Sequence, residues 1–535
     1  MIAIKDLIGK GYFPKELPPP FYTDLLSQHA IDSGSNILPE LYNSSKITFH
    51  ARHNQLRSGS LRRILSIPNP ISQCKVAHEI YNNWGGIINK IEESDISISK
   101  PKLDEKRGRA LEPLHWLSSL PKIRARARAG CRYLVKADVS RFYPTIYTHS
   151  IPWALHGKDV AKRNRWGDLL GNRLDVAIRN GQDGQTVGIP IGPDTSLAIA
   201  ELILSQVDKD IAGIDKEHSL RYMDDYEIAC LTLSHAESIV NSLENALAKF
   251  ELQLNPRKVE IVELPEVLDT LWVSELRNIS LSATAEKAQF YNLVELVNKA
   301  FYCAKLYPDS GVLKYCLGRI AYLDIYSENF EFVYDIALQF IMAEPSVIST
   351  AIPLFLYDFF VDDDFDKAGD KISRLKNVLE EIICRHSELR HGSEVAWALW
   401  CASVMDITLN AGSLGDLFLM DDSVVGLIAL SLYHRGKING AVDLAYWSSM
   451  VTRDHLFDAM WLIAYESVVK NWLPSANLNF IDEVPEFAVL RSKGVSFFNN
   501  EVEPQTLVDD IIKQRENSEA SRSTQDDIFD LGYFA

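Results

Sequence analysis

The 535-residue sequence has few cysteines, and they are not grouped. Its seven cysteines are spread between positions 74 and 401 and include no Cys-x-x-Cys pair. Such scattering predicts neither a disulfide framework nor a structural zinc cluster. A reducing compartment, the cytoplasm, fits this use of cysteine.

Long hydrophobic runs are also missing. No stretch of 18 uncharged apolar residues occurs, so we expect no membrane span. Residues 1–21 include three lysines and three consecutive prolines and lack the apolar core of a signal peptide. The 47% hydrophobic content is nevertheless enough for real cores, and the length predicts about three or four folding units.

Positive charge is in deficit over the whole chain. The 55 Lys and Arg against 72 Asp and Glu give a formal charge of -17. Residues 101–173, however, hold 16 basic and 6 acidic residues, which makes this window +10 and leaves -27 elsewhere. Because association follows the field near a site rather than the overall charge, the window predicts a local site for a polyanion.

The hydrophobic pattern changes near residue 285. Before it, short β-branched runs at 133–139 and 220–231 alternate with helical patterns such as 234–250, which predicts an α+β fold. From 286 onward apolar residues recur at helical spacing. We expect helical hairpins in a solenoid or bundle, without a fixed period, from candidate helices near 333–343, 372–386, 393–408, 424–434 and 454–470. Residues 517–527 are too polar to be buried and predict a mobile end.

Three carboxylates carry the strongest chemical signal. Asp224 and Asp225 lie between two predicted strands and belong in a hairpin turn, although an ordinary exposed turn also uses Asp. Asp138 interrupts the apolar run 133–139, and an unpaired buried charge costs several kcal/mol, so a positive group should face it. With no His or Cys nearby in sequence, these acids predict a hard oxygen site for Mg²⁺ and a phosphate substrate.

The sequence resembles the reverse transcriptases in four motifs that occur in the family's order. The motifs are Asp138-Val139-Ser140-Arg141-Phe142-Tyr143, Gly188-Ile189-Pro190-Ile191-Gly192-Pro193, Tyr222-Met223-Asp224-Asp225 and Leu254-Asn255-Pro256-Arg257-Lys258. The string at 142–153 more narrowly resembles the bacterial abortive-infection and defence-associated reverse transcriptases. The likeness covers about residues 45–275 by motif and extends loosely into the helical half.

This resemblance implies right-hand-like fingers and palm followed by an all-α, HEAT-like helical-repeat domain in place of a thumb. On that basis residues 1–100 form the N-terminal segment and fingers, and residues 101–285 form the palm. Residues 286–500 form the helical domain, and residues 501–535 form a partly disordered tail.

The resemblance also assigns roles to individual residues. Asp138 and Asp224 would hold two Mg²⁺ ions, with Asp225 as the third acid and Val139 as a further metal-binding position. Lys258 would lie near the leaving pyrophosphate as a general acid, or be an exposed helix-end lysine. Tyr143 would form a wall that a 2' hydroxyl strikes, selecting dNTPs, or would be a core aromatic.

Other positions are expected to contact nucleotide or nucleic acid. Arg63, and after it Arg62, would grip the triphosphate, unless they are a solvated strand end. Gly188 and Gly192 bracket a loop before a helix at 195–207, which Asp194 would cap. Templated relatives usually carry Gln where this chain has Ile191, which puts template copying in doubt. Four further basic residues are expected to form a phosphate track for nucleic acid, or else a solvated basic face. They lie on either a strand or a helix and are Arg124, Arg126, Arg128 and Arg132.

The function expected from these residues is an antiphage DNA polymerase. It would use Mg²⁺ and dNTPs and make a DNA product that could be attached to a protein tyrosine, for which Tyr22 and Tyr42 are candidates. One alternative is an RNA-templated reverse transcriptase with a dedicated noncoding RNA, and another is a non-catalytic nucleic-acid clamp. The resemblance further implies a homo-oligomer.

Overall fold

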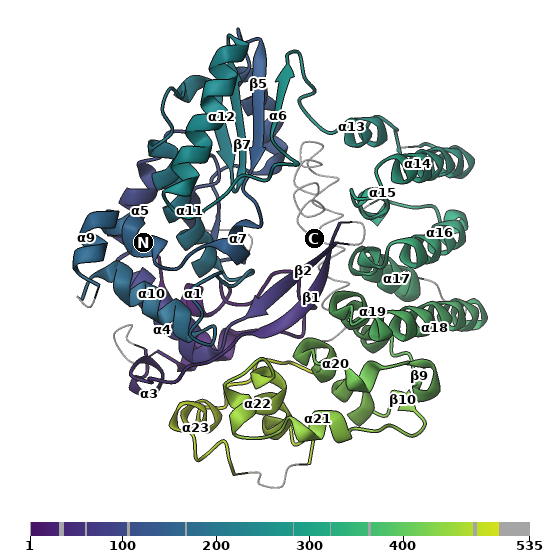
Figure 1. Ribbon diagram of the computed structural model, residues 1–535. Coiled ribbons are helices and arrows are strands. Elements are labelled where there is room, and N and C mark those ends of the chain that lie inside the picture. The colour runs from purple at the N-terminus through teal and green to yellow at the C-terminus, as the bar shows by residue number, and fades with distance from the viewer. Residues whose placement is uncertain are drawn as a thin grey trace.

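The structure is a computed structural model that describes residues 2–31, 37–58, 61–103, 108–165, 168–281, 283–321, 323–361, 365–474 and 479–501. In Figure 1 the mixed N-terminal half lies on the left, the helices after residue 286 form an arc on the right, and the last helices return along the lower edge. The predicted tail at 501–535 lies outside the described residues except for Glu501.

A four-stranded antiparallel sheet forms the centre of the N-terminal half. Its strand order is β6-β7-β5-β8, and helix α12 packs against β5 and β7. β5 is buried along most of its length, as expected from its apolar run. The bounds are β5 Tyr133–Asp138, β6 Ser219–Tyr222, β7 Asp225–Cys230, β8 Glu260–Glu263 and α12 Leu233–Ala248.

A long hairpin of β1 (Ala51–Ser58) and β2 (Leu61–Ile67) reaches from this half toward the helical arc (Figure 1). The hairpin leads into α4 (Pro70–Asn82), whose start combines a proline in the first turn with a cap. Asn69 provides that cap, since its side chain accepts a hydrogen bond from the amide of Ile71.

The other elements of the N-terminal half surround the sheet and the hairpin. They are α1 Ile4–Ile8, α2 Asp24–His29, α3 Pro39–Tyr42, α5 Trp84–Glu92, β3 Pro101–Leu103, β4 Leu111–Pro113, η1 Leu117–Ser119, α6 Leu120–Ala127, α7 Phe142–Thr145, α8 Ser150–His156, α9 Lys158–Arg163, α10 Leu170–Asn180, α11 Asp194–Lys209, η2 Lys216–His218 and α13 Leu271–Arg277.

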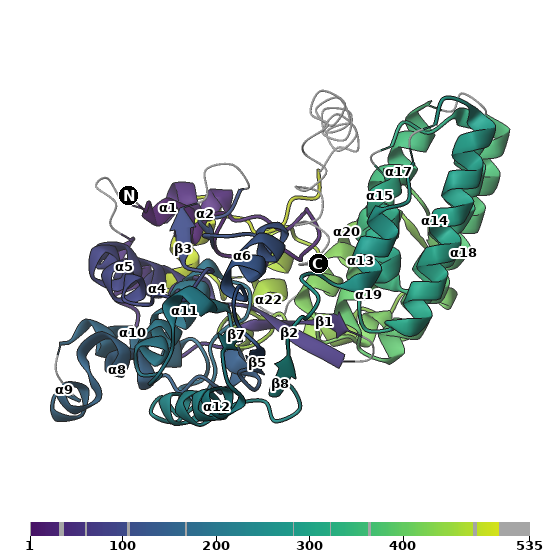
Figure 2. The same cartoon turned by 90° about the horizontal axis from the view of Figure 1, so that it is seen from above.

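Six helices after residue 285 stack as successive pairs in two layers. Figure 1 shows α14, α16 and α18 on the outside and α15, α17 and α19 on the inside, and Figure 2 shows this array standing beside the N-terminal half. The predicted helical hairpins are therefore confirmed, while their HEAT-like nature stays a prediction. The bounds are α14 Glu286–Leu306, α15 Val312–Ala321, η3 Ser327–Asn329, α16 Phe330–Ala343, η4 Pro345–Val347, α17 Ile348–Val361, α18 Phe365–Glu388 and α19 Gly392–Val404.

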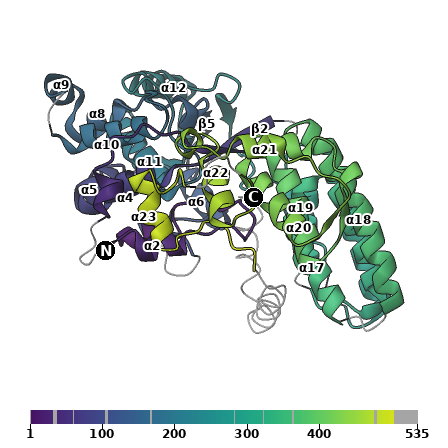
Figure 3. The ribbon, with the colours of Figure 1, turned by 90° about the horizontal axis from the view of Figure 1, so that it is seen from below.

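The final helices connect the arc back to the start of the chain (Figure 3). The helix expected at 454–470 is shorter than predicted, because a 3₁₀ turn and a bend precede α22. The elements are β9 Leu409–Asn410, η5 Ala411–Ser413, η6 Leu417–Leu419, α20 Ser423–His434, β10 Ile438–Asn439, α21 Ala445–Ser449, η7 Asp454–Leu456, α22 Trp461–Val469 and α23 Pro485–Ser492.

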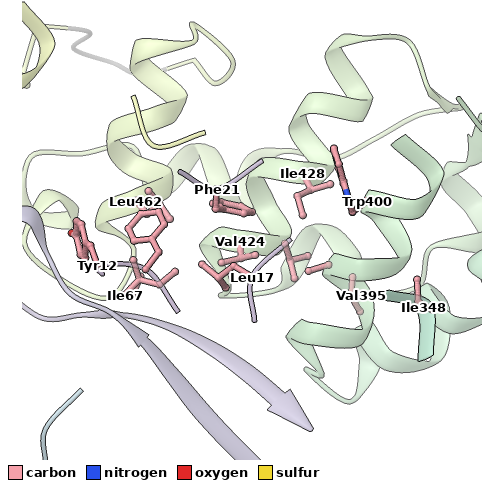
Figure 4. Close-up of a cluster of buried hydrophobic side chains, with 14 of the residues drawn as sticks. Tyr12, Leu17, Phe21, Ile67, Ile348, Val395, Trp400, Val424, Ile428 and Leu462 are labelled. Atoms are coloured by element: carbon pink, nitrogen blue, oxygen red, sulfur yellow. The ribbon is translucent and has the colours of Figure 1, made fainter. Parts of the chain in front are cut away.

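One continuous core joins residues from both ends of the chain. Tyr12 and Phe21 from the N-terminal segment pack among Val424 and Leu462 from α20 and α22 (Figure 4). The indole of Trp461 donates a hydrogen bond to the carbonyl of Ile67 at 3.1 Å. The sequence-based division at residue 286 assigns the N-terminal segment and helices α20 and α22 to different domains. In the structure they share one core, which joins the two ends of the chain.

Among the described residues, no helix has the length and apolar character that crossing a membrane requires.

Candidate active site

The three acids singled out in the sequence lie at one end of the central sheet, with their carboxylate oxygens not all within 4.8 Å of one another. Asp138 is the register partner of Asp225 across β5 and β7. The amide of Val139 donates to the carbonyl of Asp224 at 3.2 Å, which ties the hairpin turn to the end of β5. The turn itself requires a positive φ of 53° at Met223. Two strands about ninety positions apart in the chain therefore present their acids together.

The buried carboxylate of Asp138 has one cationic partner and one amide partner. Asp138, which is 6% exposed, accepts from the Lys258 ammonium at 2.7 Å and from the Asn255 side chain at 3.2 Å. The expectation that a positive group faces Asp138 is confirmed. Asn255 was part of a quoted motif, but its contact with the carboxylate could not be read from the sequence.

Asp225 has an unusual proton affinity. Although part of the residue is accessible to solvent, desolvation of the carboxyl group, and then the charges of Asp224 and Asp138, raise its pKa to about 7, while Lys258 opposes this shift. Like charges held close together disfavour ionisation. A bound cation would favour the ionised form and so lower this pKa.

A buried ionic network supports the β6–β7 hairpin, whose turn carries Asp224. The fully buried Arg221 binds Glu201 and Asp208 of α11, with guanidinium to carboxylate distances of 2.9 to 3.0 Å. It also donates to the carbonyl of Met223 at 2.8 Å, and the amide of Met223 donates to Ser99 at 2.7 Å. Both polar groups of the strained turn residue are thus fixed by side chains.

Tyr143 and Arg63 influence one another electrostatically. Tyr143 is half-buried, and its carbonyl accepts from the amide of Ile189 at 3.0 Å, which links the first and second motifs. Desolvation and then the charge of Asp224 raise the pKa of Tyr143, whereas Arg63 lowers it. Arg63 is exposed on β2. The Tyr143 hydroxyl therefore senses the charges of both Asp224 and Arg63.

Arg62 is directed to a different partner. It is on the strand next to Arg63, so the two side chains point to opposite faces of the hairpin. Its guanidinium binds both oxygens of Glu394 on α19 and the side chain of Asn54. Because Glu394 is only 3% exposed, Arg62 compensates a buried charge. In this structure the Arg62 guanidinium is engaged by Glu394, and a triphosphate contact by Arg62 stays a prediction.

The loop of the second motif is packed against the protein itself. The carbonyl of Ile191 accepts from the amide of Ser66 on β2. Gly192 has a φ of 130°, and a Cβ there would lie 2.5 Å from a carbon of Pro14. Gly192 is thus required for close packing with the N-terminal segment, and nucleotide contact by Ile191 and Gly192 stays a prediction.

Asp194 was expected to cap helix α11, but it does not. It is the first residue of the helix, and its carboxylate accepts instead from the amides of Ala110 and Leu111 at 2.9 and 3.0 Å. Arg109 binds the same carboxylate. The acid therefore joins α11 to β4 rather than satisfying its own helix.

The predicted arginine track is largely engaged in ion pairs. Helix α6 places Arg124 and Arg128 one turn apart, and both bind Glu227 of β7. They also donate to carbonyls of residues 266–268, and Arg132 pairs with Glu263. Acids from outside the 101–173 window thus cancel much of its +10 charge. Arg124 and Arg128 are thus engaged within the protein, whereas Arg126 and Arg132 are exposed, and the phosphate track stays a prediction.

The two candidate primer tyrosines have separate environments. Tyr42 is 36% exposed, and its hydroxyl donates to Glu79 at 3.3 Å. Figure 1 shows its helix, α3, at the lower edge, whereas β5 and β7 lie at the upper edge. Tyr22 is half-buried, and its amide donates to the carbonyl of Phe497.

The acidic group suits hard divalent cations. Its candidate donors are the carboxylate oxygens of Asp138, Asp224 and Asp225, while the main-chain oxygens of Asp138 and Asp224 accept hydrogen bonds from the amides of Asn255 and Val139. Mg²⁺ prefers such oxygen ligands and keeps some of its waters. A cation beside Asp225 would offset the repulsion from Asp224 and Asp138 that helps to raise its pKa, which is a further reason why the residues fit a cation.

The same segment matches a family of known proteins. The family model described as "Reverse transcriptase (RNA-dependent DNA polymerase)" matches residues 60–291. The chain contains a reverse transcriptase domain. This domain holds all three carboxylates, Lys258 and Arg63, and it indicates a nucleotidyltransferase of the reverse transcriptase type.

Two solved structures show weaker likeness to the whole chain. Apo telomerase from Candida tropicalis has a TM-score of 0.31 and 12% identity, over 72% of this chain and 68% of that one. Telomerase from Candida albicans, in complex with a TWJ fragment of telomeric RNA, has a TM-score of 0.29 and 12% identity, over 66% of this chain and 65% of that one. No curated protein matches the sequence.

Proposed function

We propose that the reverse transcriptase domain is an active, Mg²⁺-dependent polymerase of dNTPs. The observation that carries the proposal is the meeting of Asp138 with Asp224 and Asp225 at the end of the β5–β7 pair. A non-catalytic clamp would have no use for this charge cluster, which costs stability whenever no cation is present. The presence of all three acids therefore favours the enzyme over the clamp.

Each residue of the site has a role in this proposal. Asp138 and Asp224 hold the metal ions, with Asp225 and the main chain of Val139 as further ligands. When bound, these ions would lower the pKa of the attacking hydroxyl and neutralise the triphosphate. Arg63 binds the triphosphate, and Tyr143 forms the wall beneath the sugar that favours dNTPs.

Lys258 is proposed as the proton donor to the leaving pyrophosphate. In this structure its ammonium pairs with Asp138 and is 51% exposed on the side chain. Release from Asp138, when cations take over the neutralisation of that carboxylate, would leave the ammonium available to the leaving group. General acids of this kind contribute about 10²- to 10⁴-fold.

We further propose that the enzyme belongs to the antiphage group and starts DNA synthesis on a protein tyrosine without a template. Support comes from the string at 142–153 and from Ile191, which provides no side-chain amide beside the nucleotide. The protein would act in the cytoplasm as a homo-oligomer, with the helical arc as an assembly surface. DNA is then both product and covalent partner.

The test is an incubation of the purified full chain with labelled dNTPs and Mg²⁺. The product is divided and treated with RNase or with proteinase before electrophoresis. We expect labelled DNA that survives RNase and shifts in mobility after proteinase, and a nucleotide adduct on tyrosine by mass spectrometry. DNA that is free of protein and abolished by RNase would overturn protein priming in favour of copying from a noncoding RNA.

The antiphage role needs a cellular test. Cells that express the chain should resist phage, and cells that express Asp138→Asn should not. Resistance that is unchanged in this variant would favour the nucleic-acid clamp over the polymerase.

A further inference from the structure

Two histidines and a buried glutamate gather where the helical arc meets the β1–β2 hairpin. Helix α18 ends in a turn in which the amide of His391 donates to the carbonyl of His386 at 2.9 Å. Arg390 occupies this turn with a φ of 57°, a left-handed conformation that ends many helices. The turn returns the chain into α19, so Glu394 in its first turn lies beside both histidines.

The three side chains direct their ligand atoms toward one another. The Nδ1 atoms of His386 and His391 lie 3.0 Å apart, and they lie 3.9 and 3.7 Å from an oxygen of Glu394. All three ligand atoms fall within 4.8 Å of one another. Among the described residues this is the one group of three or more His, Cys, Asp or Glu side chains that meets this criterion.

The surroundings keep both imidazoles in the form that binds metals. Desolvation lowers the pKa of His386 and of His391, and the charge of Arg62 lowers both further. Neutral imidazole and ionised carboxylate are the states in which these groups act as ligands. Burial is substantial, since the side chains of His386, His391 and Glu394 are 12%, 25% and 3% exposed.

Arg62 orients the carboxylate. Its guanidinium binds both oxygens of Glu394, with a distance of 2.8 Å from Nη2 to Oε2. Ligand carboxylates in metal sites are commonly held by such outer hydrogen bonds, which fix their orientation. The β1–β2 hairpin thus positions Glu394, a ligand that belongs to the helical arc.

We propose that His386, His391 and Glu394 bind one divalent transition-metal ion, of the Zn²⁺ class, at the joint between the fingers and the helical arc. Two imidazoles and one carboxylate suit Zn²⁺ and leave the fourth position of a tetrahedral ion to a water. The scarcity of cysteine predicted no structural zinc cluster, but this site uses histidine instead. Since Arg62 contacts a ligand, the ion stabilises the connection between the two halves of the chain.

The experiment uses Co²⁺ and Zn²⁺ as probes on the full-length protein after chelation. Co²⁺ is titrated in excess Mg²⁺, which occupies the carboxylates of the polymerase site. We expect the strong visible absorption of tetrahedral Co²⁺ to saturate at about one ion per chain. Zn²⁺ should displace this signal and raise the melting temperature, because a ligand that binds only the folded state stabilises it.

Variants identify the ligands. His386→Ala and His391→Ala should each lose the absorption and the Zn²⁺-dependent rise in melting temperature, whereas the matched control His434→Ala should keep both. His434 is an exposed histidine on the neighbouring helix α20. Arg62→Ala should weaken Co²⁺ binding about 10- to 100-fold, as expected for a residue that orients a ligand.

Two results would overturn the proposal. One is the absence of both tetrahedral Co²⁺ absorption and a Zn²⁺-dependent rise in melting temperature in the wild-type chain. The other is an absorption that persists unchanged in both histidine variants while their melting curves show that they fold. Neither readout depends on polymerase activity, so failure here is separate from failure of the proposed function.

Discussion

Asp138 lies directly opposite Asp225 in the antiparallel register of β5 and β7, and the two carboxyl groups have different charge environments. Asp138 is paired with Lys258 at 2.7 Å, whereas the pKa of Asp225 is raised to about 7. One acid thus has a cationic partner, and the other takes up a proton near neutral pH in the absence of metal.

This difference predicts a pH-dependent stability for the metal-free protein. The pKa of Asp225 rises from 3.8 to about 7 on folding, so between these values the folded state binds more protons than the unfolded state. The free energy of unfolding therefore falls as pH rises through this window. In Asp225→Asn this contribution should vanish, which denaturant titrations of both proteins between pH 4 and pH 8 would measure. Parallel curves for the two proteins would contradict the assignment.

The network behind the catalytic turn predicts separate effects on stability and activity. Arg221→Met leaves Glu201 and Asp208 buried without their cation and should cost about 3 to 5 kcal/mol of unfolding free energy. Ser99→Ala removes both the acceptor for the Met223 amide and the hydrogen bond that the hydroxyl donates to Glu201. It should cost about 1 to 3 kcal/mol, while lowering kcat because the turn that carries Asp224 loosens. Urea denaturation and steady-state dNTP incorporation give the two quantities. A stable Arg221→Met protein with full activity would refute this support role.

Adjacent arginines of β2 should respond differently to truncation. Arg63→Ala should raise KM for dNTPs with little change in melting temperature, because Arg63 is exposed near the site. Arg62→Ala leaves Glu394 buried and unpaired and should cost about 2 kcal/mol or more of stability, with KM nearly unchanged. The two variants are controls for each other, and the reverse pattern would show that Arg62 is the phosphate ligand.

Lys258 provides a test of proton donation. If Lys258 protonates the leaving pyrophosphate, Lys258→Gln should lower kcat by about 10²- to 10⁴-fold. Lys258→Arg keeps the pairing with Asp138 but transfers a proton poorly, so it should retain stability and lose activity. Equal activity in Lys258→Arg and the wild type would reduce the role of Lys258 to charge neutralisation.

Much of the catalytic centre was predictable because charge in an apolar run is rarely accidental. Asp138 stood out in this way, and the structure places a cation against it. The same reasoning applies to Glu201 and Asp208 in the apolar helix α11 and to Arg221 in β6, which pair with one another, but they were not singled out. The signal that was missed, a charged residue within an apolar segment, could be read locally from the sequence.

The basic residues could not be assigned from the sequence, since their partners come from distant segments. Arg124 and Arg128 are paired by Glu227, about a hundred positions away, and Arg62 by Glu394. A charge count over residues 101–173 includes neither Glu227 nor Glu394. The helical hairpins were predictable from their 3.6-residue period, but the return of α20–α23 to the N-terminal segment depends on which apolar faces meet, and periodicity does not encode that.

The central claim is that Asp138 takes part in nucleotide transfer, and labelled dNTP incorporation by Asp138→Asn tests it most directly. Asp183→Asn is the matched control, because Asp183 is exposed and its φ of 56° suits Asn as well as Asp. We predict incorporation in the wild type and in Asp183→Asn, and a loss of at least about 10²-fold in Asp138→Asn with an unchanged circular dichroism spectrum. Undiminished incorporation by a folded Asp138→Asn protein would contradict the account.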